Sequence, residues 1–146
     1  TTEIYTLSLH DALPIFETHK MFLNKESPAN AYFFIADQSP SSVRQSIRVD
    51  FLGQPTLWLH GIEKYARMYD LPVFYFGIRR EGRGRYSVFF KEITTQPRQM
   101  EIGEITRRYA SILEEEIRNY PDNWLWSHRR WKKKVLPGMQ SPDQPS

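Results

Sequence analysis

The most apolar run in the chain, PVFYFGI at Pro72–Ile78, limits the possible folds more than any other feature. A run this short, rich in aromatic and β-branched residues, predicts a buried β-strand. The charged, glycine-containing stretch Arg79–Gly84 predicts a tight basic turn after it, and Arg85–Ile93 follows with apolar residues at alternate positions. We therefore expect a β-hairpin, with the second segment antiparallel to the first.

The remaining patterned segments give the chain the order of an α/β protein. They are Tyr32–Ala36 as a buried parallel strand, Ser46–Leu52 as a strand, a helix from Pro55 to Tyr69, an amphipathic helix at Gly103–Tyr120, and a short helix after Pro121. This order predicts an α/β fold in which a mixed sheet is flanked by helices.

Length and composition indicate one packed domain. The chain has 146 residues, of which 40% are hydrophobic and 14% aromatic, as a globular core requires. It contains no cysteine, which excludes disulfides and thiolate metal sites. We expect the domain to occupy residues 16–136, and residues 137–146, rich in Pro, Ser and Gln, to form a disordered tail.

The first fifteen residues, Thr1–Ile15, carry a different kind of signal. Their sequence, TTEIYTLSLHDALPI, can be written in codons that read as a widely used sequencing adapter translated in frame. We interpret this segment as an adapter-derived artefact and exclude it from the fold. On this interpretation Phe16 is an interior residue of a longer protein, and source DNA upstream of its codon will not encode Thr1–Ile15.

A second unusual segment is Pro121–Lys134, in which three tryptophans alternate with basic residues. Tryptophan side chains are common at boundaries between an apolar region and water, because the ring is apolar and its N–H is polar. Clustered Lys and Arg bind phosphate or anionic head groups. The segment therefore predicts a partner that is both apolar and negatively charged. The alternative interpretation is a solvated helix end that carries a few core tryptophans.

Three stretches of the sequence resemble the lipid A biosynthesis (lauroyl/myristoyl) acyltransferase family. WLWSHRRWK at Trp124–Lys132 is similar to the family's C-terminal signature, and FIADQSPSS at Phe34–Ser42 resembles its strand and Asp-centred loop. LHGIEKYARMYDLPVFYFGIRR at Leu59–Arg80 resembles the family's glycine-containing helix, Pro-Val strand and paired arginines. The resemblance runs from Tyr32 to Lys134 in the family's order.

The resemblance implies the C-terminal part of a glycerolipid-acyltransferase-like mixed sheet and a membrane-associated enzyme. Such an enzyme transfers a fatty acyl group from acyl carrier protein to a hydroxyl of a lipid A precursor, a phosphorylated glycolipid. It needs no cofactor and no metal. It works at the cytoplasmic face of the inner membrane, to which it is bound peripherally or by an N-terminal anchor. A neighbouring interpretation is acyl transfer to a lysophospholipid or an aminolipid.

The chain departs from the family in its catalytic residues. Glycerolipid acyltransferases use a histidine with an aspartate five positions later, which orients the imidazole that takes the acceptor's proton. None of the four histidines, at positions 10, 19, 60 and 128, is followed by an aspartate at that spacing. We therefore expect no catalytic dyad in this chain and no activity from the chain alone.

The resemblance nevertheless places candidate binding residues. The substrate-binding candidates are Asp37, Gln38, Arg79, Arg80, Arg129 and Arg130, and the membrane-contact candidates are Trp124, Trp126, Trp131, Lys132 and Lys133. Each group has a simpler alternative: Asp37 as the cap of a loop, the first two arginines as an exposed turn, and the tryptophans as core residues. For His128 we expect packing or capping.

A function from another class also fits the basic segment. A non-enzymatic module that binds RNA or an acidic membrane through Trp124–Lys134 would bind less tightly as salt is added. Base readers need exposed aromatic side chains on a sheet face, and the sequence does not point to such a face. We therefore expect an anionic membrane surface as the partner, and no nucleic acid.

Overall fold

The computed structural model describes residues 31–40, 43 and 46–132. The chain divides into two units, Thr1–Phe33 and Phe34–Ser146, and every helix and strand described here belongs to the second. The elements are β1 (Ser46–Phe51), β2 (Gln54–Leu59), α2 (Gly61–Tyr69), β3 (Val73–Gly82), β4 (Arg85–Thr94), the 3₁₀ turn η2 (Pro97–Gln99), α3 (Glu104–Asn119) and the 3₁₀ turn η3 (Pro121–Asn123). The adapter-like segment and the predicted C-terminal tail lie outside the described residues.

The α/β class is confirmed, but the strands are arranged differently from the predicted mixed sheet. They form two separate antiparallel pairs, β1–β2 and β3–β4. The predicted β3–β4 hairpin and the amphipathic helix α3 are both present. Tyr32–Ala36, predicted as a buried parallel strand, has no regular secondary structure. The strands described here pair only as β1 with β2 and β3 with β4, and Ile35 in this segment is exposed and not buried.

The predicted helix from Pro55 to Tyr69 is wrong in its first part, where the structure places β2. Leu52 and Gly53 both adopt a positive φ, 51° and 78°, which closes a two-residue hairpin turn. This turn folds β2 back onto β1 and pairs Phe51 with Gln54. Trp58, only 1% exposed, therefore reaches the core from a strand, and the helix begins three residues later at Gly61.

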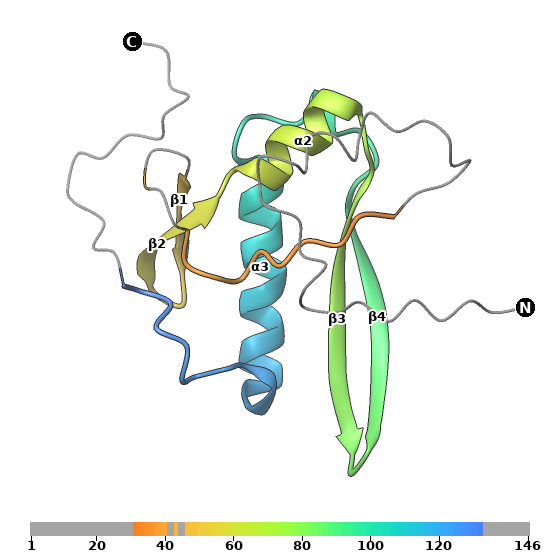
Figure 1. Cartoon of the computed structure of the whole chain (residues 1–146), viewed down its shortest axis with the longest axis vertical. Helices are drawn as coiled ribbons and strands as arrows, with labels where there is room; N and C mark the ends of the chain where they lie inside the picture. Colours follow the sequence, from red (N-terminus) through yellow and green to blue (C-terminus); the bar gives the residue numbers. More distant parts are fainter. Residues whose placement is uncertain (1–30, 41–42, 44–45, 133–146) are drawn as a thin grey trace, which may run out of the picture. The chain divides into compact units, whose positions relative to one another are not determined.

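Helix α3 lies between the two hairpins and joins them (Figure 1). Its Tyr109 ring is 5.6 Å from the ring of Trp58 on β2 and 5.6 Å from the ring of Tyr75 on β3, measured between centroids. Ile105, Ala110, Leu113 and Ile117 continue the same buried face, spaced as the apolar stripe of an amphipathic helix. The core is therefore one cluster with α3 at its centre, and it includes side chains from β1, β2, α2, β3 and β4.

A buried carboxylate fixes the start of α3. Gly103, the N-cap residue, adopts φ 85° and has no side chain to cap the helix. Glu63 on α2, 1% exposed, supplies the cap instead: it accepts hydrogen bonds from the Gly103 N–H at 2.5 Å, the Thr106 N–H at 3.1 Å and the Thr106 hydroxyl at 2.6 Å. A negative charge at a helix N-terminus also interacts favourably with the helix dipole. Glu63 therefore ties α2 to α3 across forty residues of sequence.

We predict that Glu63→Gln lowers the free energy of unfolding by about 1–3 kcal/mol, because the amide retains one acceptor oxygen and turns an N–H group towards N–H donors. Urea unfolding monitored by circular dichroism measures this change. Glu92→Gln, at an exposed position on β4, is the matched control and is expected to shift stability by less than about 0.5 kcal/mol. Equal stability of the Glu63→Gln variant and the wild type would contradict the capping role.

Candidate functional site

Two stretches that are far apart in the sequence lie against each other: the loop Asp37–Pro40, here called the Asp37 loop, and Trp124–Lys132, here called the Trp-basic segment. The Ser39 hydroxyl donates to the carbonyl of Arg129 at 3.2 Å and is also bonded to the carbonyl of Arg130. The basic segment is in turn anchored on β2: the Trp131 indole N–H donates to the Thr56 hydroxyl at 2.8 Å, and Arg130 Nη2 donates to the Leu57 carbonyl at 2.7 Å. Three stretches of the chain thus meet at one place.

Arg130 is the buried cation of this site. It is 2% exposed, and its guanidinium carbon lies 4.5 Å from the centre of the Trp58 ring, a cation–π contact. Burial lowers the pKa of Arg130 to about 10, while the charges of Asp37 and Tyr109 act in the opposite direction. The guanidinium stays charged at neutral pH. Its Nε is buried and has no hydrogen-bond partner among the residues that the structure describes.

Two phenols accompany this cation and the Asp37 carboxylate. Burial, helped by the negative charges of Glu116 and Asp37, raises the pKa of Tyr75 to about 12, and Arg79 opposes the change. Burial raises the pKa of Tyr109 even more strongly, with Asp37 again contributing. Both hydroxyls therefore remain protonated at neutral pH and can donate hydrogen bonds. We define Asp37, Tyr75, Tyr109 and Arg130 as the polar cluster, because the charge of Asp37 influences the pKa of each of the other three and the Tyr75 and Tyr109 rings lie 5.6 Å apart.

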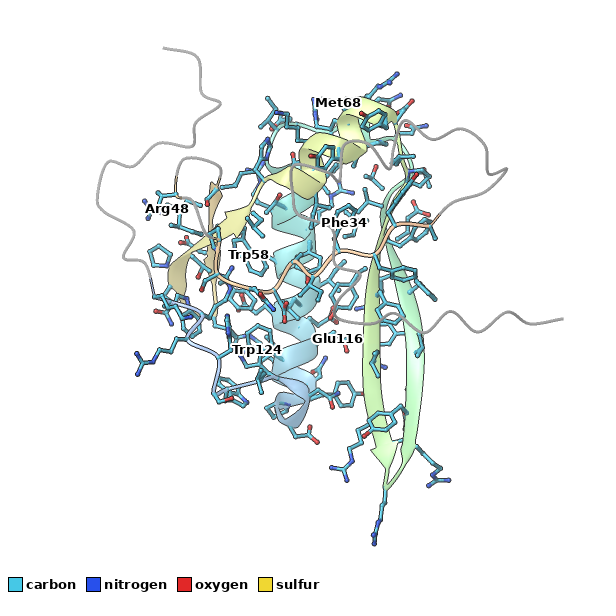
Figure 2. All side chains as sticks on the ribbon, viewed as in Figure 1. Phe34, Arg48, Trp58, Met68, Glu116 and Trp124 are labelled. Atoms are coloured by element: carbon cyan, nitrogen blue, oxygen red, sulfur yellow. The ribbon has the colours of Figure 1, made fainter. Side chains whose placement is uncertain are left out.

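Arg79, predicted to bind substrate, already has a partner within the chain. Its Nε and Nη2 donate to the two carboxylate oxygens of Glu116 at 3.0 Å and 2.8 Å, and its guanidinium stacks on the rings of Phe89 and Tyr120 at 4.2 Å and 4.6 Å. The hydrogen bonds that Arg79 donates to Glu116 raise the pKa of Arg79. Figure 2 shows Glu116 on the side of α3 that faces β3. A phosphate would have to compete with this bidentate pair.

The other predicted substrate-binding residues lie at the surface. Gln38, Arg80 and Arg129 are exposed, whereas Asp37 is half-buried. The two arginine pairs therefore each combine an arginine that is bound within the fold, Arg79 or Arg130, with an exposed one, Arg80 or Arg129. An exposed arginine without a competing carboxylate is the better candidate for contact with a phosphate.

The predicted membrane-contact tryptophans divide in the same way. Trp124 and Trp131 pack against the hydrophobic core, and the Trp124 ring lies 6.1 Å from that of Phe51 (Figure 2). Trp126 is 60% exposed, although its indole N–H donates to the Pro121 carbonyl at 2.7 Å. Lys132 is exposed, and Lys133 lies outside the described residues. Of the three tryptophans, only Trp126 is open to an external partner.

The two phenols of the polar cluster are not predictable from the sequence. Tyr109 stands in the apolar stripe of α3, whose periodicity indicates core, and Tyr75 is one aromatic residue in a strand of aromatics. The charge of Asp37 acts on both phenols although Asp37 is distant from them in the sequence. No local pattern signals such a contact.

The described residues offer few other sites. A small pocket of about 80 Å³ lies between β3 and the end of α3, well below the roughly 300–1,000 Å³ of typical ligand pockets. In the same part of the chain, no three His, Asp or Glu side chains are grouped to hold a metal ion. No helix between residues 46 and 132 is long and apolar enough to cross a bilayer.

Comparison with known families agrees with the three motifs. The model of the bacterial lipid A biosynthesis acyltransferase family matches residues 22–133, which is more than half of the chain. The chain belongs to this family. The match includes every described residue of the polar cluster and of the Trp-basic segment, and it supports acyltransferase activity in general. No curated protein and no solved structure matches this family member significantly.

We predict that Tyr75 and Tyr109 make stability fall in alkaline solution. A tyrosine whose folded pKa is raised stabilises the fold fully below its unfolded pKa of 10.0, and this contribution is lost as pH rises towards about 12. Arg130, whose pKa is lowered, makes stability rise with pH over the same range. Because Tyr109→Phe removes one of the two tyrosines and leaves Arg130 in place, it is expected to reduce the loss of stability by about 1.4 kcal/mol per pH unit.

Urea unfolding at a series of pH values between 10 and 12 measures this difference. Tyr86→Phe, which removes an exposed phenol, is the matched control and should give a curve parallel to that of the wild type. If the Tyr109→Phe curve also runs parallel to the wild type, the Tyr109 phenol is not in the buried environment described here.

Proposed function

We propose that this chain forms the acceptor-binding part of an acyltransferase that moves a fatty acyl group from acyl carrier protein to a hydroxyl of a lipid A precursor. The observation that carries the proposal is the meeting of the Asp37 loop with the Arg129–Trp131 segment through Ser39. This contact brings a half-buried carboxylate near a buried cation and leaves Arg129 exposed beside them. Family membership supplies the reaction class.

The chemistry of the polar cluster suits a sugar-hydroxyl acceptor. Asp37 can accept a hydrogen bond from a hydroxyl, and the protonated Tyr75 and Tyr109 can donate to sugar oxygens. These bonds gain strength because the cluster is partly shielded from water. Arg129 and Arg80, both exposed, are the candidates for the phosphate of the acceptor, and Gln38 lies next to the carboxylate as a further polar contact.

The acyl donor and the location of the enzyme follow from the same proposal. We propose acyl carrier protein as the acyl donor, as the resemblance to the family implies; the chain's formal charge of +3 would favour an acidic partner. A phosphorylated glycolipid acceptor lies in a membrane, so we propose that the enzyme works at the cytoplasmic face of the inner membrane. Lysophospholipid and aminolipid acceptors remain the alternatives to be compared directly.

We predict that Asp37→Asn weakens binding of a phosphorylated glucosamine-disaccharide lipid at least tenfold, because a hydrogen bond to a charged group contributes about 1.5–3 kcal/mol. Binding of the lipid in detergent micelles to the purified chain is measured by titration calorimetry. Asp50→Asn, at an exposed site on β1, is the matched control and should bind as the wild type does. Tighter binding of lysophosphatidic acid than of the disaccharide lipid would favour the alternative acceptor.

We predict that Arg129→Ala lowers the preference for the phosphorylated acceptor over its dephosphorylated form by about fivefold, the effect of losing about 1 kcal/mol of attraction. The two lipids are compared in the same micelles. Arg48→Ala, another exposed arginine, should leave the preference unchanged. Because no histidine in the sequence has the dyad spacing, we expect the chain to bind the acceptor without transferring an acyl group to it.

A further inference from the structure

The two arginines that are bound within the fold lie at opposite ends of one series of aromatic rings. The guanidinium carbon of Arg79 lies 4.2 Å from the centre of the Phe89 ring. The guanidinium carbon of Arg130 lies 4.5 Å from the centre of the Trp58 ring. Both distances are those of cation–π contacts, so each arginine is attached to an aromatic side chain of a hairpin.

Ring contacts connect these two ends through α3. The centroids of Phe89 and Tyr75 are 6.0 Å apart. Those of Tyr75 and Tyr109, and those of Tyr109 and Trp58, are each 5.6 Å apart. Aromatic pairs attract one another at about 4.5–7 Å, so the series is continuous. We call it the stacked row, and from end to end it consists of Arg79, Phe89, Tyr75, Tyr109, Trp58 and Arg130.

Glu116 on α3 fixes the Arg79 end of the stacked row. The Arg79 guanidinium donates to both carboxylate oxygens, at 3.0 Å and 2.8 Å, and it also lies over the Tyr120 ring. Lys91 on β4 approaches the same buried carboxylate at 3.7 Å. A planar guanidinium that is bonded at two oxygens and stacked between two rings is held in one orientation. The Arg79 end is therefore fixed both to α3 and to the hairpin.

Gly77 makes room for the middle of the stacked row. It lies opposite Phe89 in the β3–β4 register, and a Cβ atom at this position would overlap the tip of the Phe89 ring. Any other residue here would push that ring away from its place between Arg79 and Tyr75. The close approach therefore requires glycine, and the sequence supplies it.

Charges at the Arg79 end act on the polar cluster. The negative charge of Glu116 raises the pKa of Tyr75, and the positive charge of Arg79 lowers it. Two further charged groups face Tyr75: Asp37, whose charge also raises the pKa, and Lys91, which lies opposite it on β4. The ion pair is thus close enough to influence a residue of the candidate site without belonging to that site.

We propose that Arg79 is a positioning residue of the acceptor site: paired with Glu116, it fixes the stacked row, whose other end places Arg130 beside the Asp37 loop. The proposal rests on the proposed function, because the site that is positioned is the proposed acceptor site. Packed side chains can carry such coupling between separate places in a protein. In this role Arg79 does not touch the acceptor, in contrast to the substrate contact that the family resemblance implies for it.

Acceptor binding separates positioning from direct contact. Arg79→Gln and Glu116→Gln are each expected to weaken binding of the phosphorylated glucosamine-disaccharide lipid about fivefold, and to weaken binding of its dephosphorylated form by the same factor. Titration calorimetry with the lipids in micelles measures both. Glu115→Gln removes the same charge from the exposed neighbouring position on α3 and should bind as the wild type does.

The stacked row itself is tested by Gly77→Ala, which displaces the Phe89 ring and leaves every charge in place. We expect the same fivefold weakening, about equal for both lipids. Gly61→Ala, at a position where a Cβ atom meets no neighbour within 4 Å, is the matched control and should not affect binding. Circular dichroism identifies the folded variants, and three independent variants are available for the comparison.

A second measurement needs no lipid. The pKa of Tyr75, about 12 in the wild type, is followed by NMR of ¹³Cζ-labelled tyrosine, with the signal assigned by its loss in Tyr75→Phe. Loss of the negative charge in Glu116→Gln should lower this pKa, whereas loss of the positive charge in Arg79→Gln should raise it. Glu115→Gln should leave it unchanged. Loosened packing alone would expose the phenol and lower the pKa in both variants.

Three results would overturn the proposal. Unchanged acceptor binding in Arg79→Gln, Glu116→Gln and Gly77→Ala would show that the row is core packing alone. A lost preference for the phosphorylated lipid in Arg79→Gln, with tighter binding in Glu116→Gln, would show direct contact of Arg79 with the phosphate. A Tyr75 pKa that moves in the same direction in both charge variants would leave the pair a structural role only.

The Asp37→Asn variant distinguishes this proposal from the proposed function. If Asp37→Asn weakens acceptor binding while the row variants bind normally, the positioning role fails and the acceptor site stands. If the wild type binds neither lipid, the acceptor site is absent and both proposals fail.

Discussion

The packing of Tyr109 between Trp58 and Tyr75 is the interaction on which the described structure depends. Neither hairpin is stable alone, because two strands bury too little apolar surface. Helix α3 gives both hairpins a surface to pack against, and Tyr109 contacts one residue from each. Glu63 then fixes where α3 begins and attaches α2 to the same core. The two sheets share no hydrogen bond, so side-chain packing on one helix holds them together.

The polar cluster follows from this packing. Tyr109 contacts both Trp58 and Tyr75, and the Arg130 guanidinium stacks on the Trp58 ring. Ser39 brings the Asp37 loop to the same place. The polar cluster thus joins buried residues of the core to the half-buried Asp37. Such a site has a low dielectric environment, which strengthens its hydrogen bonds and shifts its pKa values.

The sequence predicted the elements whose signals are local. The β3–β4 hairpin and α3 were correct because alternation and helical periodicity are read within a few residues. The prediction was wrong at β2. The residues after Gly53 have helical spacing, but the turn at Leu52–Gly53 pairs them with β1 as a strand. It placed Asp37 and Arg130 as site residues through family motifs, but the burial of Arg130 and the pairing of Arg79 with Glu116 depend on tertiary contacts. The sequence predicted Pro72–Ile78 as a fully buried strand, but Phe74 and Ile78 are exposed. Composition does not show which neighbouring elements cover a strand.

The central claim is that the Asp37 loop, β2 and the Arg129–Trp131 segment form one acceptor site. Hydrogen exchange with mass spectrometry, with and without the phosphorylated glucosamine-disaccharide lipid in micelles, tests it most directly. Our account predicts that the lipid slows exchange in all three segments together, at the same lipid concentration. Slower exchange in only one of the three segments, or in none, would contradict the account.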